Sequence, residues 1–217
     1  MEDWDASAGA ATGSETTVAE DVFVPAHRIV SFGDVMTGRT PDRSDTGVTG
    51  RDYGLLGYTS SRTSPPCSWA SPGVPTSCSS SGCPARGITY TNWTEQSLYP
   101  ITQIQVADAD NKISAAEALS RRWLEVLQKR ADADEQPTPE EKAVLRGQTA
   151  FAVELCREAV EVLFRASGGS VIQRGVDPQR FHRDIEGFSL HALVQLNANL
   201  EVQGRVLLGM DPATDFL

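Results

Sequence analysis

The sequence predicts a mainly helical protein built around an antiparallel bundle. Three observations support this. From Thr94 onward, apolar residues recur with a period of about 3.6 residues, an acidic run with a proline over residues 131–137 interrupts the pattern, and a helix-start signal follows at Thr138. Long amphipathic helices with short links pack side by side in alternating directions. We therefore expect a helical bundle over residues 88–217.

The first two helices of the bundle each show a continuous apolar face. On the first, the expected buried residues are Ile101, Ile104, Ala107, Ile113, Ala116, Leu119, Trp123 and Leu127. The second begins with a capping box, because Thr138 is followed by Pro139 and then by Glu141, three residues after the cap. On this second helix we expect Val144, Phe151, Leu155 and Val162 to be buried.

A third helix is predicted from about Asp184 to Leu208, ended by Gly209. Its expected buried residues are Leu190, Leu193, Leu196, Leu200 and Leu207. Three helices leave one side of such a bundle open.

In the N-terminal region, residues 1–50, the sequence predicts a short β element. Residues 11–32 alternate weakly between apolar and polar side chains, carry β-branched residues and contain a Val-Pro pair. This composition favours an edge strand that runs into a linker.

Residues 166–210 hold the most informative side chains. Gly168 and Gly169 follow the second helix, where glycine adopts the left-handed conformation without steric cost. Arg183 precedes an aspartate that suits the positive end of a helix dipole. His191 is a lone histidine inside the predicted third helix, whereas His182 is expected in a loop and His27 after a turn. Each feature also has a purely structural explanation: a helix stop, a surface pair and a structural histidine.

The order of these features resembles the carboxy-terminal domain of the acyl-CoA dehydrogenase superfamily. Within it, the sequence resembles the flavin-dependent monooxygenases that take reduced flavin from a separate reductase. In dehydrogenases whose base lies in this region, a glutamate follows the Arg-Asp pair; Ala192 holds that place here. The monooxygenases have a histidine one residue earlier, facing flavin and substrate, and His191 stands there. The resemblance therefore implies an oxygenase scaffold and argues against a dehydrogenase.

The N-terminal region resembles the last strands of the central β domain of the same family, where a Thr-Gly-Ser motif borders the flavin. Thr12 and Ser14 fall on that motif, and a plain turn is the other interpretation. The resemblance implies that these two hydroxyls, with Gly168, Gly169 and Arg183, contact the cofactor. Because Met1 lies just before this motif, we expect the amino-terminal helical domain and most of the β domain to be missing.

Residues 51–87 form an anomalous segment rich in serine, proline and cysteine, in the place where the family has the first bundle helix. A metal site is disfavoured because Cys67, Cys78 and Cys83 lack paired short spacings. A disulfide would need an oxidising compartment. A flexible linker is a simple explanation. We favour translation in a shifted frame over residues 59–84, since the alternative frame gives apolar residues at helical spacing.

The composition excludes several classes of function. The chain has 217 residues, 40% of them hydrophobic, which suffices for a core, and its formal net charge is −10. This charge argues against nucleic acid or an anionic membrane as the main partner. No basic leader with an apolar run and no apolar run of about eighteen residues occurs, so we expect a cytoplasmic protein.

Taken together, the resemblance implies a fragment of a monooxygenase that uses reduced flavin, FMNH2 or FADH2, and dioxygen to oxygenate a small organic substrate. It further implies a flavin reductase as partner and a homo-oligomer built on the bundle. His191 would orient or deprotonate a substrate hydroxyl or nitrogen, because imidazole titrates near neutrality. Two alternatives stay open: a non-catalytic helical remnant that acts as an oligomerisation domain, and an acyl-CoA dehydrogenase.

Overall fold

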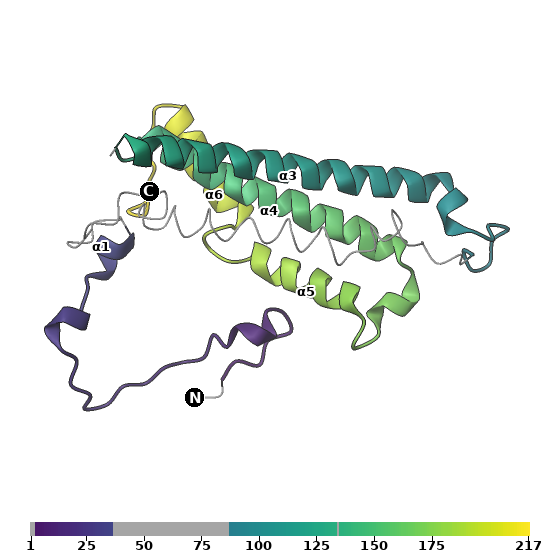
Figure 1. Cartoon of the computed structure of the whole chain (residues 1–217), viewed down its shortest axis with the longest axis horizontal. Coiled ribbons are helices and arrows are strands. Elements are labelled where there is room, and N and C mark those ends of the chain that lie inside the picture. Colours follow the sequence, from purple (N-terminus) through teal and green to yellow (C-terminus); the bar gives the residue numbers. More distant parts are fainter. Residues whose placement is uncertain (1–2, 37–86, 134) are drawn as a thin grey trace.

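The computed structural model describes residues 3–36, 87–133 and 135–217 (Figure 1). Within these ranges the α-helices are α1 (Phe32–Met36), α3 (Pro100–Asp132), α4 (Pro139–Ala166), α5 (Asp177–Ser189) and α6 (Leu196–Leu207). Short 3-10 helices are η1 (Ala10–Thr12), η2 (Ala26–Arg28), η5 (Gln96–Leu98) and η6 (Gly169–Ile172). The anomalous segment over residues 51–87 lies outside the described residues except for Gly87. The helix expected there and the shifted frame over residues 59–84 stay predictions, as do the domain boundaries near residues 50 and 87.

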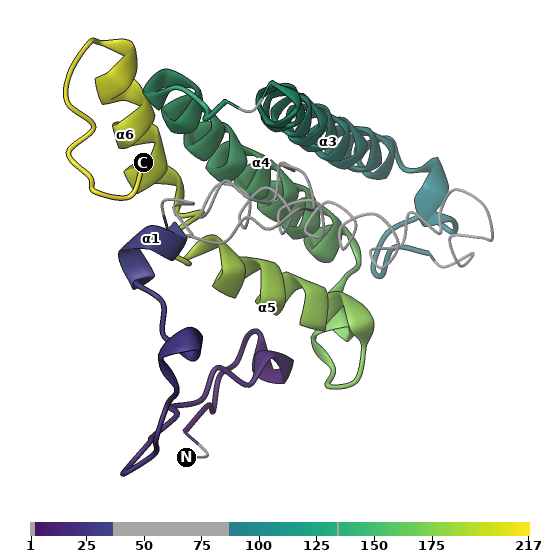
Figure 2. The ribbon, with the colours of Figure 1, turned by 60° about the vertical axis from the view of Figure 1, so that its left-hand side comes forward.

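The predicted helical bundle is confirmed, with α4 at its centre. Figures 1 and 2 show α3 running antiparallel to α4, while α5 and α6 lie along the other sides of α4. The core is a single cluster of small and medium apolar side chains around one large ring. It contains Ala109, Ile113, Ala116, Trp123, Leu127, Val153, Cys156, Ala159, Val160, Leu163 and Ile185. Three of these residues, Ala109, Ala116 and Ala159, are alanines, whose small side chains take little space between the helices.

The start of α4 has the predicted capping box. The Glu141 N–H donates to the Thr138 hydroxyl at 3.2 Å, and the Thr138 N–H donates to the Glu141 carboxylate at 2.8 Å. Arg130 at the end of α3 donates to the same carboxylate through Nε at 3.0 Å and holds the pKa of Glu141 below its usual value. The connection between the two longest helices is therefore fixed by local hydrogen bonds and one ion pair.

The predicted buried face of α3 is correct in its second half and wrong in its first. Ile113, Ala116, Trp123 and Leu127 are buried, but Ala107 and Ile101 are exposed and Ile104 is 63% exposed. The buried positions instead begin at Thr102 and continue through Ala109. From Ala109 to Ala131 the buried positions follow one another at steps of three or four residues, the spacing of one face of an α-helix. Thr102 is buried and its neighbour Ile101 is exposed, whereas hydrophobicity alone predicts the opposite.

The predicted third helix is wrong in its continuity. The chain forms α5 and α6, separated by a turn over residues 190–195. Because the break changes the phase of the helix, Leu190 is 77% exposed, and Leu200 and Leu207 are also exposed. Buried positions are Ile185, Val194, Asn199 and Val202. Phe151 on α4, predicted to be buried, is exposed as well.

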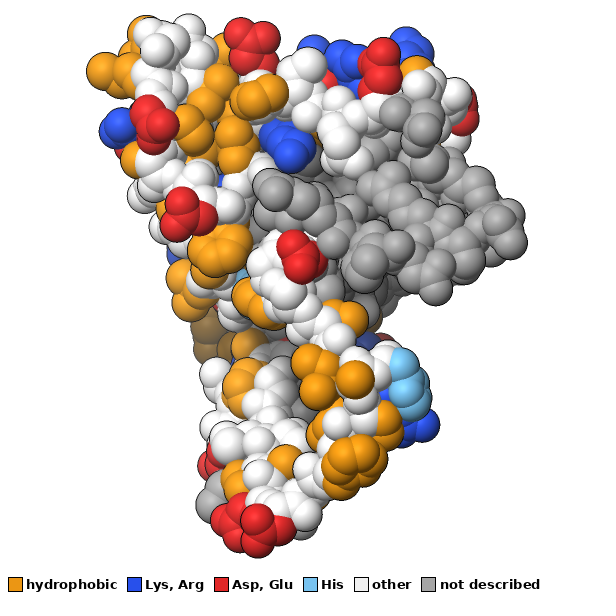
Figure 3. All heavy atoms as spheres, turned by 90° about the vertical axis from the view of Figure 1, so that its left-hand side faces the viewer, with side chains coloured by type: hydrophobic (Ala, Val, Ile, Leu, Met, Phe, Trp, Pro, Cys, Tyr) orange, Lys and Arg blue, Asp and Glu red, His pale blue; other side chains and the backbone are white. Residues whose placement is uncertain are grey.

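The predicted β element is not observed: residues 3–36 contain η1, η2 and α1 joined by extended chain, with no strand. A strand needs backbone partners on a neighbouring strand, and the described residues offer none. The apolar side chains of residues 3–36 are accordingly exposed, among them Val22, Phe23, Ile29, Val30 and Phe32. Figure 3 shows hydrophobic side chains at several places on the face that it presents.

Across the described ranges, no helix combines the length with the apolar composition that crossing a bilayer requires.

Candidate functional site

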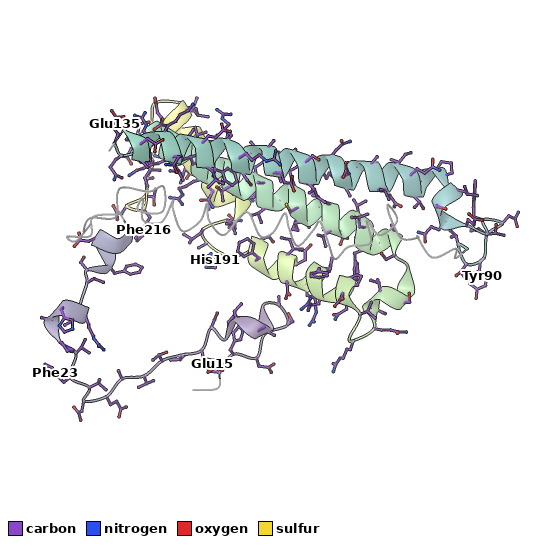
Figure 4. All side chains as sticks on the ribbon, viewed as in Figure 1. Glu15, Phe23, Tyr90, Glu135, His191 and Phe216 are labelled. Atoms are coloured by element: carbon purple, nitrogen blue, oxygen red, sulfur yellow. The ribbon has the colours of Figure 1, made fainter. Side chains whose placement is uncertain are left out.

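The turn between α5 and α6 carries His191. The His191 N–H donates to the Phe188 carbonyl at 3.0 Å, and the His191 carbonyl accepts from the N–H groups of Val194 at 2.9 Å and Gln195 at 2.8 Å. The Leu193 N–H donates to His191 Nδ1 at 3.3 Å. Figure 4 places His191 just beyond the end of α5, and the residue is exposed. The predicted candidate thus lies in a hydrogen-bonded turn, where its ring is accessible.

A buried asparagine is hydrogen-bonded to the backbone of this turn. Asn199 on α6 donates to the carbonyls of Gln195 at 2.8 Å and Ala192 at 3.4 Å. Its Oδ1 accepts from Nε of Arg146 on α4 at 3.0 Å. Sequence reasoning missed Arg146 and Asn199, because neither belongs to a motif. The one signal for Asn199 is an amide among the apolar residues of a helix.

The Arg183–Asp184 pair connects α5 to the N-terminal segment. Arg183 Nη1 donates to the Ser7 carbonyl at 2.8 Å, and the Gly9 N–H donates to Asp184 Oδ1 at 2.8 Å. Between these two contacts the chain approaches α5 so closely that a Cβ added at Gly187 would come within 2.5 Å of the Ala8 Cβ. The pair therefore binds backbone groups of residues 7–9, which come shortly before the Thr-Gly-Ser motif in the sequence.

Thr12 and Ser14 lie in the small loop that follows this contact. Their hydroxyls are 2.9 Å apart and hydrogen-bonded, and both residues are exposed. The loop closes on itself through the Thr12 N–H, which donates to the Gly9 carbonyl at 2.9 Å. Trp4 donates through its indole N–H to the same Gly9 carbonyl at 3.1 Å. Arg183 thus contacts the N-terminal segment at Ser7, five residues before Thr12.

Gly168 and Gly169 lie at the opposite end of α5 from His191. Gly168 has a φ of +74° and a ψ of −179°, an extended conformation with positive φ that is essentially limited to glycine and differs from the left-handed helical conformation predicted for a helix stop. Gly169 begins η6, which leads into α5. The thirteen residues of α5 correspond to about 20 Å of helix. These glycines are therefore separated from the His191 turn by the length of α5.

A charged cluster joins α4 to α5 around His182. This residue lies within α5, so the predicted loop position is wrong; its ring stacks on Phe164 with centroids 4.2 Å apart. His182 Nε2 is 2.6 Å from the Glu161 carboxylate and 3.9 Å from that of Glu186. The nearest ligand atoms of these three residues lie within 4.8 Å of one another, which is a spacing that a metal ion could use.

Arginines already occupy the carboxylates of this cluster. Arg165 pairs with Glu161, and Arg157 pairs with Glu186 at 3.0 Å and with both carboxylate oxygens of Glu154. Arg165 first, and His182 to a smaller extent, lowers the pKa of Glu161; Arg157 lowers the pKa of Glu154. Two of these contacts, Arg157–Glu186 and Glu161–His182, join α4 to α5, so the charged cluster acts as a clamp between the two helices.

Comparison with known proteins shows the family to which this helical domain belongs. Residues 84–196 match the family model of the acyl-CoA dehydrogenase C-terminal domain. The chain is 28% identical over 223 residues to the oxygenase component of an FADH(2)-dependent resorcinol hydroxylase from Rhizobium sp. (strain MTP-10005), covering 96% of this chain and 53% of the relative. It is 25% identical to the oxygenase component of p-hydroxyphenylacetate 3-hydroxylase from Acinetobacter baumannii, covering 98% of this chain and 50% of the relative.

The fold is also shared with solved structures. XiaF from Streptomyces sp., solved in complex with FADH2 and glycerol, superposes with a TM-score of 0.84 at 24% identity, over 99% of this chain and 54% of that one. The chain thus spans about half the length of the curated relatives that it matches.

Proposed function

Because this chain belongs to the acyl-CoA dehydrogenase C-terminal domain family, we propose that it is part of a reduced-flavin-dependent monooxygenase that hydroxylates a small aromatic compound. The observation that carries the proposal is the exposed His191 in the α5–α6 turn, next to an alanine in place of a carboxylate base. The relatives named as hydroxylases of resorcinol and p-hydroxyphenylacetate support an aromatic substrate.

The residues near Arg183 fit the polar edge of a reduced flavin. Hydroxyls both donate and accept hydrogen bonds, and the Thr12–Ser14 pair uses only one donor on itself. Both residues are exposed, so a ligand reaches them without rearrangement of the core. When bound, the flavin supplies the electrons for oxygen activation, and the protein supplies binding and orientation. We favour FADH2, which the Rhizobium relative uses and XiaF binds.

Further parts of the proposal concern the other predicted site residues. Gly168 and Gly169 have no side chains, and the space beside Gly169, where an added Cβ would meet nothing within 4 Å, is available to a distant part of an extended cofactor. His191 orients the substrate hydroxyl or nitrogen through its ring. A separate flavin reductase is the expected partner, because the relatives are named as oxygenase components. Ile101 and Ile104, exposed on α3, favour self-association. We place the protein in the cytoplasm.

Anaerobic equilibrium dialysis of the purified chain against FADH2 and FMNH2 tests the cofactor. We expect saturable binding of FADH2 that a Thr12→Val, Ser14→Ala double variant weakens about tenfold, the effect of losing one or two hydrogen bonds. Thr17→Val, an exposed threonine of the same segment, is the matched control and should bind normally.

Turnover is then measured with a flavin reductase, dioxygen and either resorcinol or p-hydroxyphenylacetate. The proposal predicts hydroxylated product that His191→Ala abolishes while FADH2 still binds. Failure of the wild-type chain to bind either reduced flavin would remove the enzymatic proposal for this chain. The non-catalytic oligomerisation domain, which the exposed isoleucines of α3 also favour, would then be the better account.

A further inference from the structure

We propose that Asn199 positions His191 and determines which of its ring nitrogens carries the proton, and that Arg146 holds Asn199 in the required orientation. The catalytic meaning of this inference rests on the proposed function. The geometry belongs to the chain itself, so it can be tested without flavin or substrate.

Asn199 is a completely buried polar side chain whose two ends face different elements. Its exposed fraction is 0%. The Nδ2 group donates to the carbonyls of Gln195 and Ala192, which both belong to the turn that carries His191. Buried amides are retained where their hydrogen bonds fix a particular backbone arrangement. The side chain therefore ties this turn to the interior of the bundle.

Arg146 decides which way the amide of Asn199 points. A guanidinium can only donate, so the atom of Asn199 that faces Arg146 at 3.0 Å must be the oxygen. Arg146 also donates to the Phe216 carbonyl at 2.6 Å, and no carboxylate of the described residues acts on its guanidinium. Burial lowers the pKa of this guanidinium. A partly buried cation that meets only neutral oxygens orients them, and here it leaves the N–H groups of Asn199 for the turn.

The backbone of the turn also places a hydrogen-bond donor against the ring of His191. The carbonyl of His191 accepts from the Val194 and Gln195 N–H groups, which brings the Leu193 N–H to 3.3 Å from Nδ1. A ring nitrogen that accepts a hydrogen bond carries no proton, so the neutral imidazole has its proton on Nε2. His191 therefore offers an N–H donor from Nε2. It orients a substrate oxygen and does not remove a proton from it.

The decisive variant is Asn199→Asp. Aspartate keeps the shape and still accepts from Arg146, but it has no N–H for the carbonyls of Ala192 and Gln195. Asn197→Asp, the same change at an exposed position of α6, is the matched control. The readout is the proton position on the ring of His191 in long-range proton–nitrogen correlation spectra at alkaline pH, together with amide exchange at Val194 and Gln195.

We expect one tautomer, protonated at Nε2, in the wild type and in Asn197→Asp. In Asn199→Asp we expect a mixture of tautomers and about tenfold faster exchange at both amides, as for loss of one net hydrogen bond. A proton on Nδ1 in the wild type, or an unchanged ring and unchanged amides in folded Asn199→Asp, would overturn the proposal. Circular dichroism establishes that each variant is folded.

Arg146→Met tests whether Arg146 holds the amide of Asn199 in its orientation. Without a donor at position 146 the amide of Asn199 is free to turn over, so the mixture of tautomers should reappear, and Arg146→Lys should restore much of the single form. An unchanged ring in Arg146→Met would exclude Arg146 from the mechanism. In an active enzyme, Asn199→Asp should lower kcat while FADH2 affinity is unchanged. Absence of flavin binding would contradict the proposed function and leave the result on the ring intact.

Discussion

The bundle around α4 and the N-terminal segment, residues 3–36, are held in place by different forces. In the bundle, large side chains such as Trp123, with an exposed fraction of 0%, are enclosed by neighbouring helices. In the segment, Phe23 is 87% exposed and points away from the helices (Figure 4). Apolar burial maintains the first region, whereas a few polar contacts to α5 position the second.

This difference matters because the proposed site uses both regions. His191 belongs to the bundle, and Thr12 and Ser14 belong to the segment. Their connection runs through Arg183, Asp184 and the close approach at Gly187, which precedes His191 by four residues. Damage to the core should therefore destroy the fold, while damage to these contacts should separate the two halves of the site in a folded protein.

The largest effect is expected from Trp123→Ala. Removal of a fully buried aromatic side chain should lower the free energy of unfolding by about 3–5 kcal/mol. Phe23→Ala should change it by about 0.5 kcal/mol or less, because the ring is already in water. Urea unfolding followed by circular dichroism measures both. Comparable losses in the two variants would show that the segment contributes to the core.

Trp123→Phe sharpens this test. The Trp123 indole N–H has no hydrogen-bond partner among the described residues. Because phenylalanine fills much of the same space without this buried donor, its cost should be clearly smaller than that of alanine.

A second prediction separates the two regions directly. In Gly187→Ala the new methyl group would collide with Ala8, so residues 7–9 should leave α5. Amide exchange at Gly9, whose N–H donates to Asp184, should become about tenfold faster, as expected for loss of roughly one hydrogen bond. The bundle should be unchanged or more stable by about 0.5–1 kcal/mol, because alanine favours a helix over glycine.

Gly204→Ala is the matched control for that variant. Gly204 is also helical, but an added Cβ there meets nothing within 4 Å. It should gain the same helix stability and leave exchange at Gly9 untouched. Equal exchange at Gly9 in the two variants would show that the close approach at Gly187 does not position the segment.

The smallest effect concerns pH. Arg165 and Arg157 lower the native pKa values of Glu161 and Glu154 below the reference value of 4.5. Their stabilising contribution is therefore complete above pH 4.5 and is lost as the pH falls through the native values. Glu161→Gln should remove up to about 1 kcal/mol of this dependence. Glu125→Gln, exposed on α3, should retain it, and identical acid profiles for both variants would contradict a stabilising ion pair at Glu161.

The comparison of regions also shows where sequence reasoning succeeds. The capping box at Thr138 and the second half of the α3 face depend on nearby residues, and both were predicted. The strand over residues 11–32 was wrong because strands need partners that the described chain does not supply. The break after α5 was missed because the leucine pattern continues across it.

The site was predictable in part for the same reason. His191 could be singled out from its neighbours in sequence, whereas Arg146 and Asn199 act through hydrogen bonds between residues 53 apart. Contacts of this kind leave no local pattern. His182 was placed in a loop because the helix that contains it begins earlier than expected, at Asp177.

Hydrogen exchange of the chain with and without FADH2, under anaerobic conditions, tests the central claim most directly. The account predicts slower exchange both at residues 12–14 and in the turn over residues 190–195, with the core of α4 unchanged. Saturating FADH2 that leaves both of these segments unaffected would contradict the claim that the N-terminal segment and the His191 turn form one flavin site.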